Sequence, residues 1–419
     1  MAGSAWSIER LTPMISSLIK IRCVNIIGLA SGLILACTDA FSEVILSPAS
    51  SREIVATMQP FPSKARGAVE ALLDFADGTK PAFTPCSTQP LVDFVSAACV
   101  TDSGWKLFDR NGAAGAAYVV TVRTPLDRYL ALNFHPGIPD YAVFPASLRY
   151  SACLNNNEMK RAYACIGTGP TGTQVYVTGR MTGVEEITPN PESGSYFSYT
   201  NSRTFVRCQV ADRDVLFSCS DTLAPSTYSL RGVPVGPLDQ ALFYYSGKPG
   251  LNLSGMTWML SQITRSTTLS VYVALNSNET AVATFAWLNA GWQGLNVTRA
   301  SHILNSQRNT LDFSRRIAQH PAVSAPIIAA IVDTVNGMTP AAIHADYGKY
   351  LAYVGRIRRD QERKGLFSCN SLLHELYDPK ASQAIPQTHM RALIIQERLR
   401  TILGIPTWSI DANGSLIQK

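Results

Sequence analysis

The chain has 419 residues, of which 46% are hydrophobic and only 16% charged, and its formal net charge is +6. That charged fraction lies below the ~25% typical of soluble domains, and the length allows two or three domains. Nucleic-acid binding usually calls for a concentrated basic stripe. A basic cluster is present, but Asp360 and Glu362 interleave with it, which is typical of a solvated helix face; its members are Arg356, Arg358, Arg359, Arg363 and Lys364. We therefore expect no nucleic-acid partner.

The N-terminal residues 1–42 read as an export signal. Lys20 and Arg22 precede an apolar run at 24–36, which has the length of a signal-peptide core and is short for a membrane span. The small residues around Phe41 predict cleavage that leaves Glu43 as the first mature residue. The protein is therefore expected to be periplasmic, in the outer envelope or extracellular.

Two other ways of processing this end stay open. Residues 34–37 resemble a lipobox whose Cys37 would be acylated, although Leu35 is bulky where such a motif usually has a small residue. The apolar run can also stay uncleaved as an anchor. Because the segment before Lys20 is long for a signal peptide, Met14 is an alternative start. Either retention or acylation would give the chain its membrane contact through this end.

Residues 43–141 predict a mixed α/β region. Residues 68–75 have helical character, and residues 90–95 look like the start of a helix behind Pro90. Residues 117–122 are a β-branched and aromatic run that predicts a buried strand. Both element types therefore occur before residue 142.

Residues 142–300 predict an antiparallel β domain. β-branched and aromatic residues alternate with polar ones, and Gly, Pro and Asn clusters separate the runs. Residues 175–178 and 269–273 are the clearest strands. The latter is expected to turn through 276–279 and return along 281–287 as a hairpin.

Six cysteines form three closely spaced pairs that predict local disulfides. The partners are 13, 12 and 11 positions apart: Cys86 with Cys99, Cys153 with Cys165, and Cys208 with Cys219. Disulfides form and persist outside the reducing cytosol, so the pairs agree with export. Each closed loop would add about 3 kcal/mol of stability on the chain-entropy model.

The predicted pairs imply local structures. If Cys208 faces Cys219 in a hairpin, residues 213–214 form a two-residue turn. Alternation then places Val206, Val210, Val215 and Phe217 on the face of these cysteines. Cys153 and Cys165 are expected to span a second hairpin that turns through 155–157. The first pair, at 86 and 99, suggests a loop tied to a helix.

Residues 301–419 predict a small helical bundle. The helical pattern starts at residue 309, and Pro and Gly mark helices at 324–337 and 339–365, followed by 372–376 and 388–403. The second helix carries one apolar stripe at three- and four-residue steps. Its members are Ile343, Tyr347, Tyr350, Leu351, Val354 and Ile357. The fold class is therefore α+β, with a disulfide-clipped β-rich centre followed by helices.

The sequence lacks the common catalytic motifs. It has no Gly-x-Ser-x-Gly elbow, His-Glu-x-x-His pair, Cys-x-x-Cys pair or Gly-x-x-x-x-Gly-Lys phosphate-binding loop. The remaining catalytic candidates are His374, Glu375 and Cys369. Helix capping and burial explain them better, because a spacing of five residues turns Cys369 about 140° from His374 on a helix. We expect neither a metal nor a cofactor.

Two acidic pairs are candidates for the two carboxylates of a glycosidase. Glu185-Glu186 and the pair Asp212 and Asp214 fall at predicted turns, where acidic residues are ordinary. Without a defined spacing between carboxylates, a glycosidase has no support.

These observations favour an exported binding or structural protein, a component of a cell-envelope or surface assembly with protein partners. One alternative is a secreted glycosidase or peptidase whose site forms only in the fold. Another is a viral or phage surface protein. The lean toward a non-enzyme rests on the missing nucleophile, base and metal motifs.

Overall fold

The computed structural model describes residues 58–170, 174–191, 193–235, 238–252, 258–363, 385–405 and 408. The chain divides into two compact units, Met1–Thr57 and Met58–Lys419, and all described residues belong to the second. The predicted signal segment 1–42 lies outside them.

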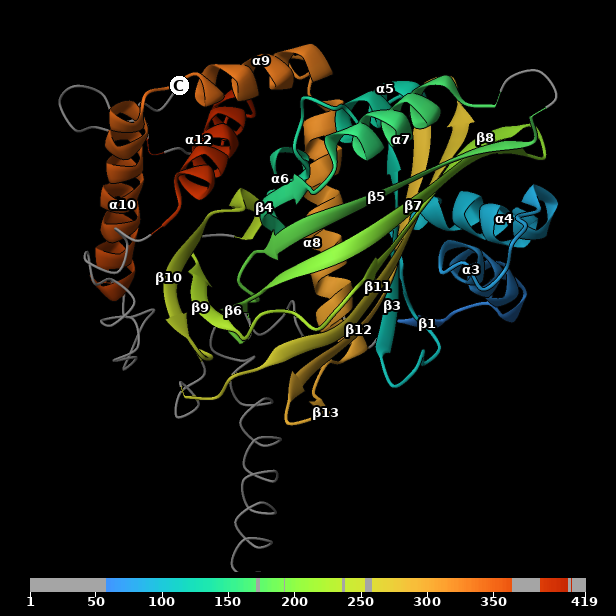
Figure 1. Ribbon diagram of the computed structural model, residues 1–419, viewed down its shortest axis with the longest axis horizontal. Helices are drawn as coiled ribbons and strands as arrows, with labels where there is room; N and C mark the ends of the chain where they lie inside the picture. Colours follow the sequence, from blue (N-terminus) through green and yellow to red (C-terminus); the bar gives the residue numbers. More distant parts are fainter. Residues whose placement is uncertain are drawn as a thin grey trace, which may run out of the picture. The chain divides into compact units, whose positions relative to one another are not determined.

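The architecture is α+β and is built on one large, mostly antiparallel sheet (Figure 1). Its strand order is β1-β2-β3-β12-β11-β8-β7-β5-β4, with β13 paired to β12. Among the strands of the described residues, only β1 and β2 pair in parallel. The strands are β1 (Gln59–Pro60), β2 (Gly104–Lys106), β3 (Ala114–Val122), β4 (Leu148–Cys153), β5 (Tyr176–Ile187), β7 (Ser198–Val210), β8 (Arg213–Thr222), β11 (Gln262–Asn276), β12 (Glu279–Trp292) and β13 (Leu295–Asn296).

A second, three-stranded sheet and a set of helices complete the unit. The small sheet has the order β10-β9-β6, with β6 (Ser195–Tyr196), β9 (Leu230–Pro234) and β10 (Phe243–Pro249). The helices are α3 (Ser63–Ala76), α4 (Gln89–Ala98), α5 (Leu126–Asn133), α6 (Asp140–Val143), α7 (Asn156–Thr168), α8 (Ala300–Gln319), α9 (Ala325–Asn336), α10 (Pro340–Arg363) and α12 (Gln387–Ile402), with short 3₁₀ turns η2 (Pro85–Thr88), η3 (Cys99–Thr101) and η4 (Leu238–Gln240).

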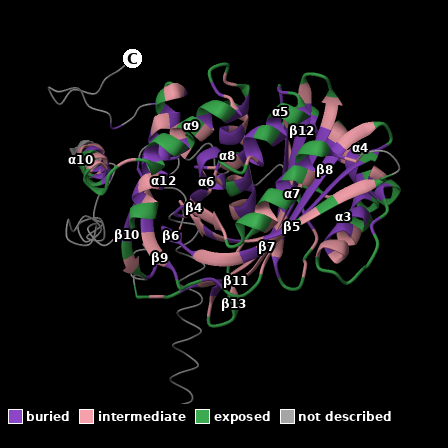
Figure 2. Ribbon diagram, turned by 45° about the horizontal axis from the view of Figure 1, so that its top comes forward, coloured by how far each residue is buried: buried purple, intermediate pink, exposed green. Residues whose placement is uncertain are grey.

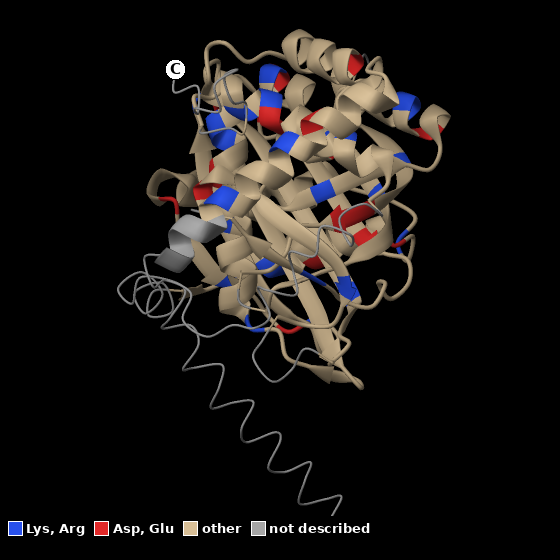
Figure 3. Ribbon diagram, turned by 90° about the vertical axis from the view of Figure 1, so that its left-hand side faces the viewer, with Lys and Arg blue, Asp and Glu red and all other residues tan. Residues whose placement is uncertain are grey.

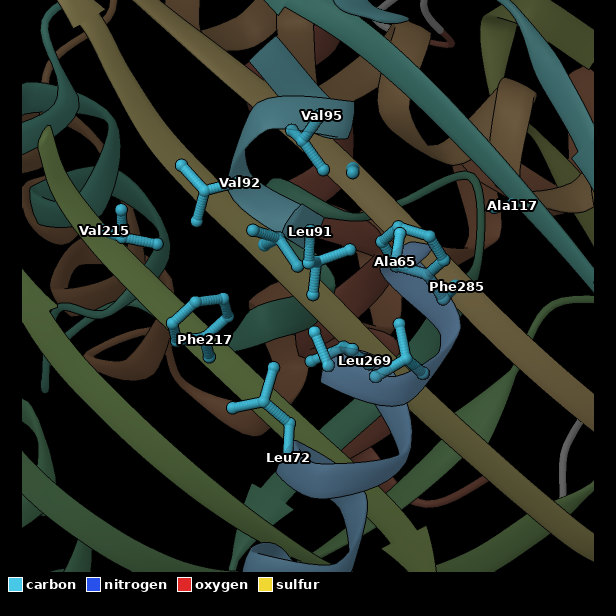
Figure 4. Close-up of a cluster of buried hydrophobic side chains, with 14 of the residues drawn as sticks. Ala65, Leu72, Leu91, Val92, Val95, Ala117, Val215, Phe217, Leu269 and Phe285 are labelled. Carbon is cyan, nitrogen blue, oxygen red and sulfur yellow. The ribbon is translucent and has the colours of Figure 1, made fainter. Parts of the chain in front are cut away.

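One face of the large sheet is covered by α3 and α4. Leu72 and Leu91 from these helices pack with Phe217, Leu269 and Phe285 from the strands in one buried cluster (Figure 4). Strand side chains alternate between faces, so Leu269, Val271 and Val273 of β11 all join this core. Burying each large apolar side chain contributes about 1.5–3 kcal/mol.

The other face of β3 and β12 is covered by α8. Gln307 on α8 is buried, and its Nε2 donates to the carbonyls of Ala116 and Thr284 at 3.1 Å each. Because helices lie on both faces, β3 is a nearly continuous apolar run without a polar side. Figure 2 shows the central strands as mostly buried. The helical pattern had been expected from residue 309, but α8 begins nine residues earlier, at Ala300.

Several predicted elements are confirmed. The hairpin at 276–279 joins β11 to β12 with Asn276 opposite Glu279. Helix α9 ends at Gly337, and α10 begins at Pro340. On α10 the side chains of Ile343, Tyr347, Tyr350 and Val354 are buried as the stripe predicts, whereas Leu351 is half-buried and Tyr353 is buried beside it.

The C-terminal helices are present and contact the rest of the unit. Gln396 on α12 is buried and donates to the carbonyls of Tyr141 and Leu148, at 3.0 Å each. Strand β3, from the first predicted region, pairs with β12 from the second. The boundaries at 141 and 300 stay predictions about chain organisation.

Within the described residues no single helix has both the length and the apolarity to cross a membrane. Helix α9 and the start of α10 together have the length and composition of a span, but the chain bends by 110° between them.

The predicted register around Cys208 and Cys219 is wrong. Cys208 lies opposite Val215, and Cys219 lies opposite Thr204, because the turn falls at residues 211–212. The two cysteines are therefore four ladder positions apart, about 13 Å at ~3.3 Å per residue. A disulfide requires Cα atoms within about 7 Å.

The other two predicted pairs are also held apart. Asn155 is the N-cap of α7, not part of a hairpin turn, and its Oδ1 accepts from the backbone N–H of Asn157 and Glu158. Cys165 thus lies about 14 Å along that helix from the end where Cys153 sits. Cys86 and Cys99 flank the ten-residue α4, roughly 15 Å long. All six described cysteines are free thiols, so the disulfide-clipped detail has no support.

Thiol chemistry tests this correction. Cys86 is exposed, whereas Cys208 and Cys219 are buried, and burial raises the pKa of both buried thiols to about 12. We expect an alkylating reagent to label Cys86 in the native protein and the two buried thiols only after unfolding in urea without reductant. Peptide mapping by mass spectrometry measures this. A peptide that joins Cys208 to Cys219 would restore the original prediction.

Candidate functional site

Titratable side chains gather at the edge of the large sheet formed by β7, β5 and β4. Two glutamates, Glu185 and Glu186, are neighbours on β5, so their side chains point to opposite faces. Both had been expected at a turn, which is wrong: they lie inside the strand, paired with β4 and β7. They organise one polar cluster on each face.

The first cluster is centred on Arg203 of β7. Its guanidinium donates to Asp140 Oδ2 at 2.7 Å and to Glu185 Oε1. The Tyr199 hydroxyl donates to Glu185 Oε2 at 2.8 Å. Asp140 comes from the start of α6, so this cluster ties a helix to two strands. We name it the Arg203 cluster.

Burial and charge compete in the Arg203 cluster. Burial raises the pKa of Asp140, and the charge of Arg203 lowers it by less. Burial opposes the positive charge of Arg203, but the charges of Asp140 and Glu185 outweigh it and raise the arginine's pKa. One fixed cation therefore lies between two buried carboxyl groups. The arginine of this cluster stays charged near neutral pH and has no proton to exchange, so its role is structural.

The second cluster is centred on Glu186. Arg149 of β4 donates to its Oε1, and His389 Nε2 of α12 lies 3.3 Å from its Oε2. Burial raises the pKa of Glu186, but the hydrogen bond to His389 and the charge of Arg149 lower it by more, so the net shift is downward. We name this the Glu186 cluster.

Aromatic rings enclose the Glu186 cluster. The Arg149 guanidinium lies 4.0 Å from the ring centre of Tyr245 and 5.4 Å from that of Tyr196, both on the small sheet. Tyr150 stacks on the His389 ring with centroids 4.7 Å apart. Cation–π and stacking contacts of this kind are each worth of order 1 kcal/mol. The cluster thus joins the large sheet, the small sheet and α12.

A third arginine, Arg207, lies on the same face of β7 as Arg203. Arg207 donates to Asp127 Oδ1 at 2.7 Å and to both oxygens of Asp214. It also donates to the carbonyls of Ile166 and Gly167 in the last turn of α7, where a cation is favourable. Asp214 therefore has a structural partner and lies on β8, while Asp212 does lie in the turn.

The arrangement leaves little for catalysis. Glycoside hydrolysis needs two carboxyl groups that flank the substrate, one as acid and one as base or nucleophile. Here Asp140, Glu185 and Glu186 are each bound by an arginine. A groove of about 620 Å³ along α7, β5 and β7 is bordered by Arg203, whose guanidinium is already engaged. Among the described residues no group of three His, Cys, Asp or Glu side chains is placed to hold a metal.

The catalytic candidates from the sequence, Cys369, His374 and Glu375, lie outside the described residues, as does Cys37. The site that the structure does show was missed. Its signal was present in β7, where Arg203 and Arg207 share one face with the buried Phe205, opposite the face of Val206 and Cys208. Charges on the buried side of an alternating strand usually have partners.

No protein-family model matches this chain, and no curated protein matches it either.

The Arg203 cluster generates a stability prediction. Arg203→Met keeps much of the side-chain volume but leaves Asp140 and Glu185 together without a cation, so we expect it to cost about 3–5 kcal/mol of unfolding free energy. The matched control is Arg265→Met, which breaks the more exposed pair with Asp221 and should cost at most about 1 kcal/mol. Urea unfolding measures both. Equal costs would contradict a structural role for the cluster.

The Glu186 cluster generates a pH prediction. Its folded-state pKa is lowered from the ordinary value of 4.5, so its stabilisation is present above that value and is lost as pH falls through the lower, folded-state pKa. We expect the free-energy gap between parent and Glu186→Gln to be largest above the ordinary pKa of 4.5 and to shrink as the pH falls below it. The pKa of Asp140 is raised instead, but Asp140 is present in both proteins and so does not account for a change in the gap. A gap independent of pH would exclude the lowered pKa.

Proposed function

We propose that this protein is an exported, non-catalytic binding or structural component of a cell-envelope or surface assembly. The observation that carries the proposal is that the acidic groups of the candidate site are bound by arginines. A general acid or base must be able to exchange its proton with a substrate. Carboxylates held by an arginine in this way fix strands and helices in place.

The strongest opposing feature is the contact between His389 and Glu186, because a histidine oriented by a carboxylate is part of hydrolase triads. The Thr388 hydroxyl lies 3.4 Å from its other ring nitrogen, Nδ1. This is longer than an ordinary hydrogen bond. Tyr150 also covers one face of the imidazole. The contact therefore supports packing of α12 more than hydrolysis.

Export now rests on the N-terminal sequence, because the six described cysteines are free thiols. Lys20, Arg22 and the apolar run at 24–36 support it. Charge distribution agrees with a protein partner: basic and acidic residues are interspersed over the described part (Figure 3).

Fractionation of the native cells tests the location. We expect the protein in an envelope or secreted fraction, with Glu43 as its N-terminal residue, and cross-linking there should recover protein partners. N-terminal sequencing is the readout. A cytosolic protein that retains residues 1–42 would refute export, and a mature chain that starts at acylated Cys37 would replace the predicted cleavage.

An activity screen tests the non-catalytic half. We expect no turnover of peptide, ester, glycoside or peptidoglycan substrates by the purified full chain. If turnover occurs, His389→Ala identifies its source, with His344→Ala on exposed α10 surface as the matched control. Turnover lost in the first variant alone, with an unchanged melting temperature, would establish a hydrolase.

A further inference from the structure

The first part of strand β5 has a free edge. Strand β4 pairs with β5 from Gly183 to Ile187 and goes no further along it (Figure 1). Tyr176–Thr182 of β5 therefore pair with β7 on one side, and no strand of the described residues pairs with their other side. An unpaired strand edge presents backbone N–H and C=O groups that can bind another extended chain. We call Tyr176–Thr182 the β5 edge.

The backbone groups of Thr178 and Arg180 point outward at the β5 edge. The carbonyl of Thr182 accepts a hydrogen bond from the Leu154 N–H at 2.9 Å, so it points away from β7. The hydrogen-bonding direction alternates from residue to residue in an antiparallel pair, so Thr178 and Arg180 face the same way as Thr182. No other described residue hydrogen-bonds to these outward groups. A strand laid along the edge would satisfy them.

A groove of about 620 Å³ follows this edge, and α7 forms one of its walls. Ala162 of α7 lies directly against Gly179 of the edge, because a Cβ on Gly179 would be 2.6 Å from the Cα of Ala162. Glu158, Arg161 and Cys165 lie on the same side of α7 and line the groove together with residues 178–182 of β5. The groove therefore runs along a free strand edge and has a polar wall.

Exposed apolar side chains mark both ends of the β5 edge. Val175, which directly precedes it, is 63% exposed, and Leu154, which bonds to its last residue, is 60% exposed. A strand added beside β5 would cover both side chains. The edge thus has the hydrogen-bonding groups and the apolar ends that an added strand uses.

The uncompensated charges of the groove are positive. Arg161 is exposed and has no carboxylate partner among the described residues. Arg180 is also exposed, and its guanidinium donates to the carbonyls of Phe75 and Ala76, which carry no net charge. Glu158 is the one acidic residue of the described groove lining. The balance therefore favours a partner that carries carboxylates.

The same charges oppose pairing of the edge with a second copy of the chain. Arg203 also borders the groove, but Asp140 and Glu185 balance its charge. Pairing of two β5 edges would bring two sets of Arg161 and Arg180 together, and neighbouring like charges are destabilising. Charged side chains at strand edges commonly prevent such self-pairing.

We propose that the β5 edge binds an acidic, extended segment of a partner protein, which adds a strand to the large sheet. The outward backbone groups of Thr178 and Arg180 provide the affinity, and the cations beside them select acidic side chains. The inference rests on the proposed binding function and names the kind of partner. Peptide binding by the purified chain does not depend on where the protein resides, so the edge and export fail or hold separately.

Peptide selection tests the proposal. The immobilised full chain is panned with a phage library of random peptides, and the selected peptides are synthesised for Kd measurements by fluorescence anisotropy. We expect acidic peptides rich in β-branched residues. Thr178→Pro removes one outward N–H and keeps the bonds to β7, so it should weaken binding about tenfold or more. The matched control Thr178→Val keeps this N–H and should bind as the parent does.

A second pair of variants tests the charge. Arg161→Gln removes an exposed cation of the groove wall, whereas Lys160→Gln removes an exposed cation of α7 that does not line the groove. We expect the first to weaken binding of the acidic peptides about threefold or more, because an exposed ion pair is lost. The second should leave the Kd unchanged.

Hydrogen–deuterium exchange of the parent locates the bound peptide without any variant. Exchange in Tyr176–Thr182 should slow, and exchange in β3 should not change. Selected peptides that bind the parent and Thr178→Pro equally, or a library that yields no acidic peptide, would overturn the proposal. So would self-association of the chain that Thr178→Pro abolishes, because the edge would then pair with a second copy.

Discussion

The described structure depends on two neighbouring buried carboxylates on a single strand. Glu185 and Glu186 point to opposite faces of β5, and their side chains are only 11% and 13% exposed, so an unpaired charge would be costly on either face. Each must therefore meet a cation, and the cations come from the flanking strands: Arg203 on β7 and Arg149 on β4. A one-residue slip of β5 would exchange the two faces and separate both pairs. The charges thus specify the register of this edge of the sheet.

The need to pair these buried charges also positions two helices. Asp140 brings α6 to one face, and His389 brings α12 to the other. Helix α12 is further held by Arg400, a buried guanidinium that donates to the carbonyls of Gln240 and Ala241 beside the small sheet. Arginine suits these positions because its planar fork makes several directed hydrogen bonds while it stays charged. The polar groups of this edge therefore serve the architecture of the sheet and its helices.

The sequence predicts the ends of helices and the faces of strands, because Pro and Gly mark helix ends and side chains alternate along a strand. Proline and glycine marked the ends of α9 and the start of α10, and Asn276 to Glu279 marked the long hairpin. The face of Val206, Cys208 and Phe217 was also predicted, since all lie in one core cluster. Their register was not, because the true partner of Cys208 lies four residues from the predicted one. An even shift keeps every side chain on its face, so a pattern of period two cannot detect it.

Other misses have physical causes of the same kind. Asn155 can initiate a turn or cap a helix, because its side chain bonds nearby backbone N–H groups in both. The start of α8 was hidden by polar residues such as Ser301 and Asn305 among its first turns. The polar clusters needed contacts between segments far apart in the chain. Glu186 and His389 are 203 positions apart, and local patterns do not report such pairs.

Hydrogen–deuterium exchange on the full chain, comparing the parent with Glu186→Gln, tests the central claim most directly. If the Glu186 cluster holds α12 on the sheet, exchange should rise in Gln387–Ile402 and in β4, because the variant leaves Arg149 without its carboxylate. Exchange in α3, α4 and β3, which share the apolar core on the other side of the unit, should stay as in the parent. Unchanged protection of α12, or an equal rise throughout the chain, would contradict the account.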